Sequence, residues 1–269
     1  MSLTTPLDQY IADHSSPEGD YLYRLFRATH IEILAPQMAS GHIQGRLLKF
    51  LVSMIRPKRI LEIGTFTGYS ALCMAEGLGE GGKIFTFEVE DELEDFTRRW
   101  IEGSQYADKI EFIIGNALET VPTLGERFDM AFIDGNKREY IEYYEMAMSH
   151  LTEGGWILAD NTLWDGHVIE PERQDAQTNG VRAFNDHVRN DERVEVVMLP
   201  LRDGLTIIKK KVKKQKEKYG QYKTEQDFTP HTEGAERHPA APCKGDTRYH
   251  GIGEHRTREP RPGHSKGLP

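Results

Sequence analysis

The sequence predicts an α/β domain with a mostly parallel sheet that ends in an antiparallel hairpin. From Arg59 onward, short apolar runs alternate with longer amphipathic stretches, which is the pattern of βαβ units. Only a short turn separates the last two apolar runs, 194–199 and 205–209, whereas a parallel connection needs a crossover of about a dozen residues or more. Apolar periodicity stops near Lys210, so we expect one domain over 1–210.

The residues before the first strand predict N-terminal helices within 1–56. Apolar side chains recur at helical spacing from Leu22 and again from Leu47. Pro36 and Gly41 lie between these two stretches and are expected to separate them.

Seven strands are expected, over residues 60–63, 84–87, 110–114, 128–133, 156–159, 194–199 and 205–209. The helices that connect them are expected at about 69–78, 91–102, 117–121, 137–150 and 178–190. Because the crossovers of a parallel sheet place helices on its faces, we expect helices on both faces.

The chain from 211 to 269 is rich in Lys, Arg, His, Pro and Gly and has hardly a branched aliphatic residue. Such a segment cannot bury enough apolar surface to offset its ordering entropy, so we expect a disordered polar tail. The tail is basic, whereas the whole chain of 269 residues has a net charge of −9, so the domain itself is acidic. An acidic domain is a poor candidate for gripping nucleic acid, where affinity comes from clustered cations.

The two cysteines, Cys73 and Cys243, form neither a disulfide framework nor a zinc spacing, which fits a reducing cytoplasm. Residues Met1 to Ser15 lack a basic segment followed by an apolar run. No apolar stretch approaches the roughly 18 residues of a membrane span. We therefore expect a cytoplasmic protein that does not cross a membrane.

Three oxygen-bearing side chains are expected at the ends of predicted parallel strands. They are Asp134 and the adjacent pair Asp160 and Asn161. In an open α/β sheet the carboxyl ends of the strands converge on one crevice, so these ligands can meet around one hard cation. Two carboxylates and an amide suit Mg²⁺ best, with Mn²⁺ or Ca²⁺ as alternatives.

The turn after the first strand, Glu62-Ile-Gly-Thr-Phe-Thr-Gly68, predicts a cofactor without pyrophosphate, because it lacks the closely spaced glycines of dinucleotide-binding turns. Glu62 could pair with the amino group of an amino acid, and Glu88, at the end of the second strand, could accept both ribose hydroxyls. A cofactor with ribose and an amino-acid group but no phosphate is S-adenosylmethionine, whose adenine would lie beside Asn116 and Ala117. Taken alone, Glu62 could be a helix-cap partner and Glu88 an ordinary strand-end acid.

From about Met38 to Lys209, the chain resembles the divalent-cation-dependent O-methyltransferases, the group that contains catechol and caffeoyl-CoA O-methyltransferases, in the bacterial form of the caffeoyl-CoA type. The resemblance implies a Rossmann-like class I methyltransferase fold. The motifs that carry it are Leu61-Glu-Ile-Gly-Thr-Phe-Thr-Gly-Tyr-Ser70, Phe132-Ile-Asp-Gly-Asn-Lys137 with Tyr140, Asp160-Asn-Thr-Leu-Trp164-Asp-Gly166 and Leu199-Pro-Leu-Arg-Asp-Gly204.

The resemblance also assigns roles to residues. It makes Asp134, Asp160 and Asn161 the metal ligands, and Asp134 and Lys137 catalytic, with Lys137 as general base. The positions it implies for cofactor binding are Met38, Ser40, Glu62, Gly64, Thr65, Phe66, Gly68, Ser70, Glu88, Asn116, Ala117 and Asp134. This sequence departs from the family at two of its positions, Asn116 and Asn136, where Asp is frequent. Asn keeps the hydrogen-bonding capacity without the charge.

The acceptor side is expected near Trp164 and Asp165, where an aromatic wall would suit a planar ring. Trp164 could equally pack in the core, and Lys137 without its acidic neighbour would be an ordinary surface lysine. Asn185 could reach the same side.

We therefore expect metal-dependent methyl transfer from S-adenosylmethionine to a hydroxyl of a small catechol-like or caffeoyl-type acceptor, with the aromatic diol as small-molecule partner. The resemblance further implies a homodimer. Two alternatives stay open: a nucleic-acid methyltransferase, which the basic tail suggests faintly, and a non-catalytic S-adenosylmethionine-binding protein.

Overall fold

The structure is a computed structural model that describes residues 5–213. The predicted polar tail, 211–269, therefore lies outside the described residues from 214 onward, and so does Cys243.

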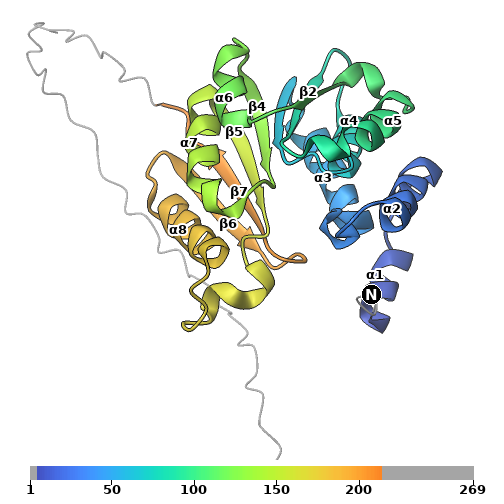
Figure 1. Ribbon diagram of the computed structural model, residues 1–269. Coiled ribbons are helices and arrows are strands. Elements are labelled where there is room, and N and C mark those ends of the chain that lie inside the picture. Colours follow the sequence, from blue (N-terminus) through green and yellow to red (C-terminus); the bar gives the residue numbers. More distant parts are fainter. Residues whose placement is uncertain (1–4, 214–269) are drawn as a thin grey trace, which may run out of the picture. The chain divides into compact units, whose positions relative to one another are not determined.

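The described strands form one seven-stranded sheet in the order β3-β2-β1-β4-β5-β7-β6 (Figure 1). Neighbouring strands from β1 to β5 pair in parallel, whereas β7 runs antiparallel to both β5 and β6. The predicted sheet and its terminal hairpin are thus confirmed. The strands are β1 (Arg59–Ile63), β2 (Lys83–Glu88), β3 (Ile110–Ile114), β4 (Phe128–Ile133), β5 (Leu151–Asp160), β6 (Val194–Leu199) and β7 (Leu205–Lys210).

Helices precede the sheet and connect its strands. The α-helices are α1 (Pro6–Asp13), α2 (Asp20–Glu32), α3 (Gly41–Ile55), α4 (Tyr69–Gly77), α5 (Glu94–Glu102), α6 (Ala117–Thr120), α7 (Tyr140–His150) and α8 (Ala176–Asn190). Short 3₁₀ turns are η1 (Pro36–Met38), η2 (Asp91–Leu93), η3 (Ala107–Lys109), η4 (Val121–Thr123), η5 (Lys137–Glu139) and η6 (Trp164–Ile169).

Strand β5 and two of the helices differ from the sequence prediction. Strand β5 begins at Leu151 rather than at Trp156, and its early part pairs with Phe128 across an irregularity in the ladder. Gly154 there has a φ of 78°. Because residues 152–155 are polar or glycine, the apolar pattern of the sequence does not predict this part of the strand. The helix expected over 137–150 is a 3₁₀ turn followed by α7, and the helix expected over 91–102 is likewise a 3₁₀ turn, η2, followed by α5.

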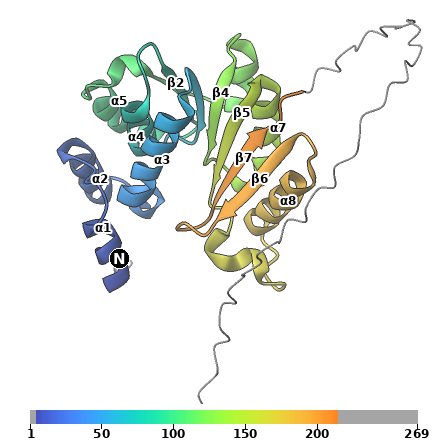
Figure 2. The ribbon, with the colours of Figure 1, turned by 180° about the vertical axis from the view of Figure 1, so that it is seen from behind.

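Strands β1 to β5 and β7 contribute to two apolar layers because successive side chains point to opposite faces. Ile60 packs into a cluster with buried residues of α3 and α4, whereas its neighbour Leu61 packs into a cluster with residues of α7 and α8. The two views of the ribbon show α3 to α5 on one side of the sheet and α7 and α8 on the other (Figures 1 and 2). Helices cover both faces, as expected.

The N-terminal helices complete the first of these layers. Leu25 of α2 and Leu48 of α3 are fully buried. Gly45 lets α3 approach α4 closely, because an added Cβ would lie 2.6 Å from the sulfur of Cys73. Cys73 is a free, buried thiol. This packing fixes the start of α3 next to the sheet.

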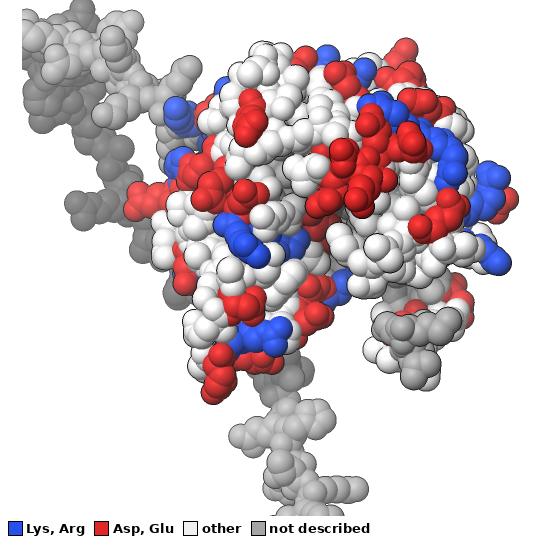
Figure 3. Space-filling model, viewed as in Figure 1, with Lys and Arg blue, Asp and Glu red and all other residues white. Residues whose placement is uncertain are grey.

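Two expectations from the sequence concern the acidic character of the domain and the lack of a membrane-spanning segment. On the face shown in Figure 3, Asp and Glu side chains form several patches, and Lys and Arg side chains lie between and beside them. Within residues 5–213, no helix is long and apolar enough to cross a membrane.

Gly180 allows α8 to lie against the turn that carries Lys137. An added Cβ at Gly180 would be 2.3 Å from the backbone oxygen of Lys137 and 3.0 Å from the Cα of Arg138. Both contacts are with backbone, which cannot move aside as a flexible side chain can. The spacing of α8 and η5 therefore depends on glycine at this position.

Gly180→Ala should lower the free energy of unfolding by roughly 2 kcal/mol, because overpacking against backbone outweighs the helix propensity of alanine. Gly79→Ala is the matched control, since an added Cβ there meets nothing within 4 Å. Urea unfolding of both variants measures the effect. Equal stability of the Gly180 variant and the wild type would contradict the close packing.

Candidate active site

The carboxyl ends of three adjacent strands bring the expected acidic residues to one edge of the sheet. Ile63 of β1 pairs with Ile133 of β4, and Ile133 pairs with Ala159 of β5. Asp134 therefore follows β4 at the same level as Asp160, the last residue of β5. Strands β2 and β3 lie on one side of β1 and β4 on the other, so this edge contains the point where the strand order reverses.

A hydrogen-bonded chain links Asp134 to Asp160. The ammonium group of Lys137 donates to Asp134 Oδ1 at 2.9 Å and to the hydroxyl of Tyr140 at 2.6 Å. That hydroxyl in turn donates to the backbone oxygen of Asp160 at 3.0 Å. Burial, together with the charges of the two aspartates, raises the pKa of Tyr140, so its hydroxyl keeps its proton. Lys137 is buried and is not an ordinary surface lysine.

Asp160 is the more deeply buried of the two carboxylates, with 4 % of the residue exposed. Its Oδ1 accepts from the backbone amide of Asn161 at 2.9 Å, and its Oδ2 accepts from Gln44 Nε2 at 2.5 Å. Burial and the charge of Asp134 raise the pKa of Asp160 to about 6. Asp134 and Asn161 are partly exposed, so the edge is open to solvent beside them.

The segment after Asp160 has an unusual backbone. Asn161, Trp164 and Asp165 all have φ between 50° and 54°, in the left-handed region that costs L-residues energy. Asp203, in the turn between β6 and β7, stabilises this shape: its backbone oxygen accepts from the amides of Leu163 and Trp164, and its carboxylate accepts from the amide of Asp165.

Trp164 lies beside Lys137, and Lys137 Nζ is 5.9 Å from the centroid of the Trp164 ring. Trp164 is partly exposed and Asp165 is exposed, and η6 has no buried residue. This position favours the interpretation of Trp164 as a wall of the site over core packing. Asn185, on α8, donates to the backbone oxygen of Thr162 at 2.8 Å and so supports the same segment.

Glu62 is fully buried on β1 beneath the first turn. Its two oxygens accept from the hydroxyls of Ser70 at 2.5 Å and Thr86 at 2.6 Å. Burial raises its pKa to about 7. Through its hydrogen bond with Ser70, Glu62 connects β1 to the start of α4 and so stabilises the turn between them.

The turn itself passes directly over Asp134. Gly64 has a φ of 98°, and an added Cβ would lie 2.4 Å from the backbone oxygen of Asp134. Thr65 and Thr86 share a hydrogen bond of 2.6 Å between their hydroxyls, which extends the chain from Glu62. Gly68, with a φ of 82°, is the N-cap residue that directly precedes α4.

Glu88, the last residue of β2, lies between the first turn and the third strand. Its carboxylate accepts from the amide of Phe66 at 2.7 Å and from those of Val89 and Glu90. Its backbone oxygen accepts from the backbone amide of Gly115, the residue after β3. Asn116 caps α6 there by accepting from the amide of Leu118, and the next residue, Ala117, is buried.

The N-terminal residues of the expected site lie on the segment before α3. Ser40 is buried, and its backbone oxygen accepts from the guanidinium of Arg202. Met38 is 59 % exposed and lies in η1.

Sequence reasoning missed several residues of this edge. Gln44, Thr86 and Arg202 received no role, although Arg202 and Asp203 belong to a quoted motif. For Thr86 the strand pairing was a usable signal, because it lies opposite Glu62 in the ladder. For Gln44, nothing in the neighbouring sequence indicated a contact with Asp160.

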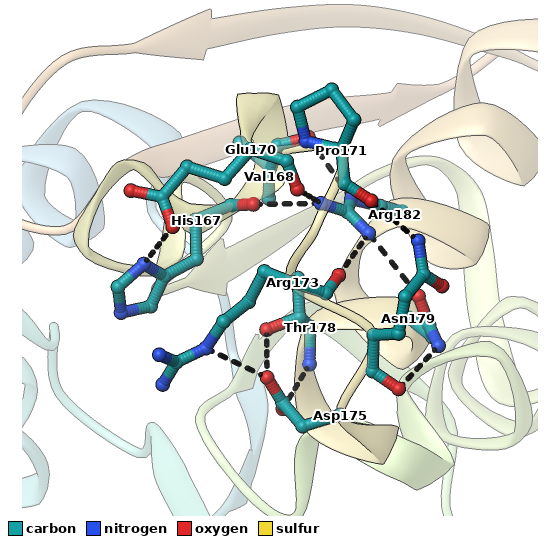
Figure 4. Close-up of polar contacts among 10 residues, drawn as sticks. His167, Val168, Glu170, Pro171, Arg173, Asp175, Thr178, Asn179 and Arg182 are labelled. Atoms are coloured by element: carbon teal, nitrogen blue, oxygen red, sulfur yellow. Dashed lines mark hydrogen bonds and ion pairs between the residues drawn. The ribbon is translucent and has the colours of Figure 1, made fainter.

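Arg182 holds the end of η6 and the loop that follows it in place. Its guanidinium donates to the backbone oxygens of Val168 at 3.0 Å, His167 at 2.9 Å and Arg173 at 2.6 Å, and also to that of Glu170. Figure 4 shows these contacts converging on one side chain. Asp175, which caps α8 by accepting from Thr178, closes the loop at its far end (Figure 4).

A second group of possible ligands, Glu145, His187 and Asp191, lies near the start of β6, at the opposite edge of the sheet. Arg193 donates to both carboxylates, at 2.7 Å and 2.6 Å. An ion pair with arginine therefore accounts for this group.

Comparison with known proteins identifies related chains. A model of the O-methyltransferase family matches residues 12–211. The caffeoyl-CoA O-methyltransferase of Stellaria longipes is 32 % identical over 217 residues, which cover 76 % of this chain and 90 % of the relative. The catechol O-methyltransferase domain-containing protein 1 of Mus musculus is 34 % identical over 207 residues, which cover 75 % of this chain and 79 % of the relative.

Solved structures agree with these relatives. The O-methyltransferase TomG from Streptomyces achromogenes, in complex with SAM, is 28 % identical with a TM-score of 0.71, over 77 % of this chain and 97 % of that one. The O-methyltransferase from Bacillus cereus, in complex with SAH, is 29 % identical with a TM-score of 0.70, over 77 % of this chain and 98 % of that one.

Glu62→Gln should change how stability depends on pH. The pKa of Glu62 is raised from 4.5 to about 7 in the folded protein, so its contribution to stability is complete below pH 4.5 and is lost as the pH rises through 7. The variant does not titrate. Its stability relative to the wild type should therefore improve by about 1–3 kcal/mol between pH 4.5 and pH 8.

Urea unfolding at several pH values, without added metal or cofactor, measures this difference. Glu172→Gln, in an exposed position, controls for the removal of one charge. A difference that stays constant with pH would show that Glu62 ionises normally.

Proposed function

Because the chain belongs to the O-methyltransferase family, we propose that it transfers a methyl group from S-adenosylmethionine to a hydroxyl of a small catechol-like or caffeoyl-type acceptor, with the help of a divalent cation. The observation that carries the proposal is the joint position of Asp134, Lys137, Asp160 and Asn161 at one edge of the sheet. That edge lies directly beside the glycine turn of β1.

The first turn and the ends of β2 and β3 support the S-adenosylmethionine site. Gly64 brings the backbone of the first turn close to that of Asp134, and Glu88 has a carboxylate at the position where acidic residues accept ribose hydroxyls. Asn116 and Ala117 begin α6 on the adenine side. The structures solved with SAM or SAH are similar to this chain over 77 % of its length, which supports the same donor here.

The chemistry of the donor set fits a divalent cation. Asp134 and Asp160 are close enough for the charge of one to raise the pKa of the other, and a cation would relieve that repulsion. The amide oxygen of Asn161 is the third oxygen donor that this set offers. Asp134, Asp160 and Asn161 would hold the ion, and an all-oxygen set favours Mg²⁺, with Mn²⁺ or Ca²⁺ as alternatives.

When bound, the cation would lower the pKa of an acceptor hydroxyl and hold it in place. Lys137 would take the hydroxyl proton at Nζ, for which it must first be neutral. The acceptor oxygen then forms a bond to the methyl carbon while the bond from that carbon to sulfur breaks, giving a methyl ether and S-adenosylhomocysteine. Tyr140 keeps Nζ in position throughout, since its hydroxyl both accepts from Nζ and donates to Asp160.

The acceptor would lie beside Trp164 and Asp165, on the segment that follows the ligand pair. An indole next to Lys137 suits a planar aromatic ring. The loop 167–173, which Arg182 holds, would form the outer part of this wall.

The alternatives receive less support. On the face in Figure 3, Lys and Arg side chains lie beside Asp and Glu side chains, an arrangement that gives no support to a nucleic-acid methyltransferase. A non-catalytic binding protein has no use for a buried lysine beside Asp134. Assembly as a homodimer and a cytoplasmic location remain part of the proposal, and light scattering after size exclusion would test the former.

A methyl-transfer assay over a panel of catechols tests the function. With Mg²⁺, we expect methyl ether products by mass spectrometry, and excess chelator should reduce the rate by a factor of about 100 or more, since metal assistance contributes several kcal/mol. Asp160→Ala should have a similar effect, whereas Asp108→Ala, an exposed change on η3, should not. Activity that survives both the chelator and Asp160→Ala would rule out the metal.

Lys137→Met tests the base separately. Methionine keeps an unbranched stem of similar length but removes the amine, so kcat should fall by about 10²–10⁴-fold. Binding of S-adenosylhomocysteine, measured by calorimetry, should be retained. Lys209→Met, an exposed change on β7, is the matched control. A variant with normal kcat would exclude Lys137 as the base.

A further inference from the structure

Arg202 connects the turn between β6 and β7 to the segment that precedes α3. Its guanidinium donates to the backbone oxygens of Ala39 at 3.0 Å and Gln37 at 3.4 Å, and to that of Ser40. It also donates to the side-chain oxygen of Gln44 at 3.2 Å. One side chain therefore holds both the segment 37–40 and the first turn of α3.

Gln44 continues this connection to Asp160. Only 1 % of Gln44 is exposed, and its amide nitrogen donates to Asp160 Oδ2 at 2.5 Å. An arginine can only donate and an ionised carboxylate can only accept. The amide of Gln44 is thus held in one orientation, with its oxygen toward Arg202 and its nitrogen toward Asp160.

The contact matters because it restricts the rotation of the Asp160 carboxylate. Its other oxygen accepts from the backbone amide of Asn161, so the two hydrogen bonds together define the plane of the carboxylate. Without Gln44, one oxygen of a residue that is 4 % exposed would lose the side-chain partner that it has within residues 5–213.

We infer that Gln44 is a positioning residue, which orients Asp160 for a divalent cation and is itself oriented by Arg202. The inference rests on the proposed function. Groups that orient metal ligands typically contribute a factor of about 10–100 to metal affinity. Gln44 would act without touching the cation.

Gln44→Met is the main test, because methionine has a similar volume and no hydrogen-bonding amide. Mn²⁺ alone serves as the probe, and electron paramagnetic resonance of the full chain without cofactor measures its affinity. We expect Mn²⁺ affinity to fall about 10-fold or more. Gln105→Met, at an exposed position, should leave it unchanged.

Arg202→Met, alone and combined with Gln44→Met, tests the second step. If Arg202 acts on Asp160 through Gln44, its effect on Mn²⁺ affinity should largely disappear in the Gln44 variant. A merely structural role of either residue would instead give additive losses. Affinity for S-adenosylhomocysteine without metal should fall in both Arg202 variants, since Arg202 also holds residues 37–40.

The outcomes separate this inference from the proposed function. Wild-type protein that fails to bind Mn²⁺, or binds it equally after Asp160→Asn, would overturn the metal site itself. Mn²⁺ binding that depends on Asp160 but is unchanged or tighter after Gln44→Met would overturn the role of Gln44 alone. Retained far-ultraviolet circular dichroism of Gln44→Met confirms that the variant is folded.

Discussion

Two neighbouring carboxylates, Asp134 and Asp160, impose the constraint on which this edge of the sheet depends. Removing a carboxylate from water is costly unless other groups hydrogen-bond to it, and a second carboxylate nearby increases the cost. Lys137 compensates Asp134, whereas Gln44 and the amide of Asn161 compensate Asp160. The 3₁₀ turn before α7, the left-handed backbone of Asn161 and the start of α3 each place one of these compensating groups.

The sequence predicts the part of this arrangement that follows from local pattern. Apolar runs and the polar residues that end them locate Asp134 and Asp160 at strand ends, and the parallel sheet then brings them together. The beginning of β5 could not be predicted, because Gly154 and Gly155 interrupt its apolar pattern. Gln44 could not be predicted either, since it meets a residue 116 positions away and such a contact leaves no periodic signal.

Glu62 shows how a motif residue depends on a neighbouring strand. Its role toward an amino group stays a prediction, and in the structure each of its oxygens accepts from one hydroxyl, that of Ser70 or that of Thr86. Ser70 lies in the same motif, but Thr86 comes from the neighbouring strand, where the ladder sets it opposite Glu62. The turn of β1 is thus ordered by a contact between strands as well as by its own glycines.

The way in which Arg182 holds the loop 167–173 bears on which side chains of this loop can change. Arg182 binds backbone oxygens, which every amino acid possesses, and makes no demand on the side chains of His167, Val168, Glu170 or Arg173. Mutations can therefore replace those side chains while the path of the loop stays the same. In the proposed function this loop borders the acceptor, so such replacements would change the contacts with the acceptor and leave the backbone of the loop in place.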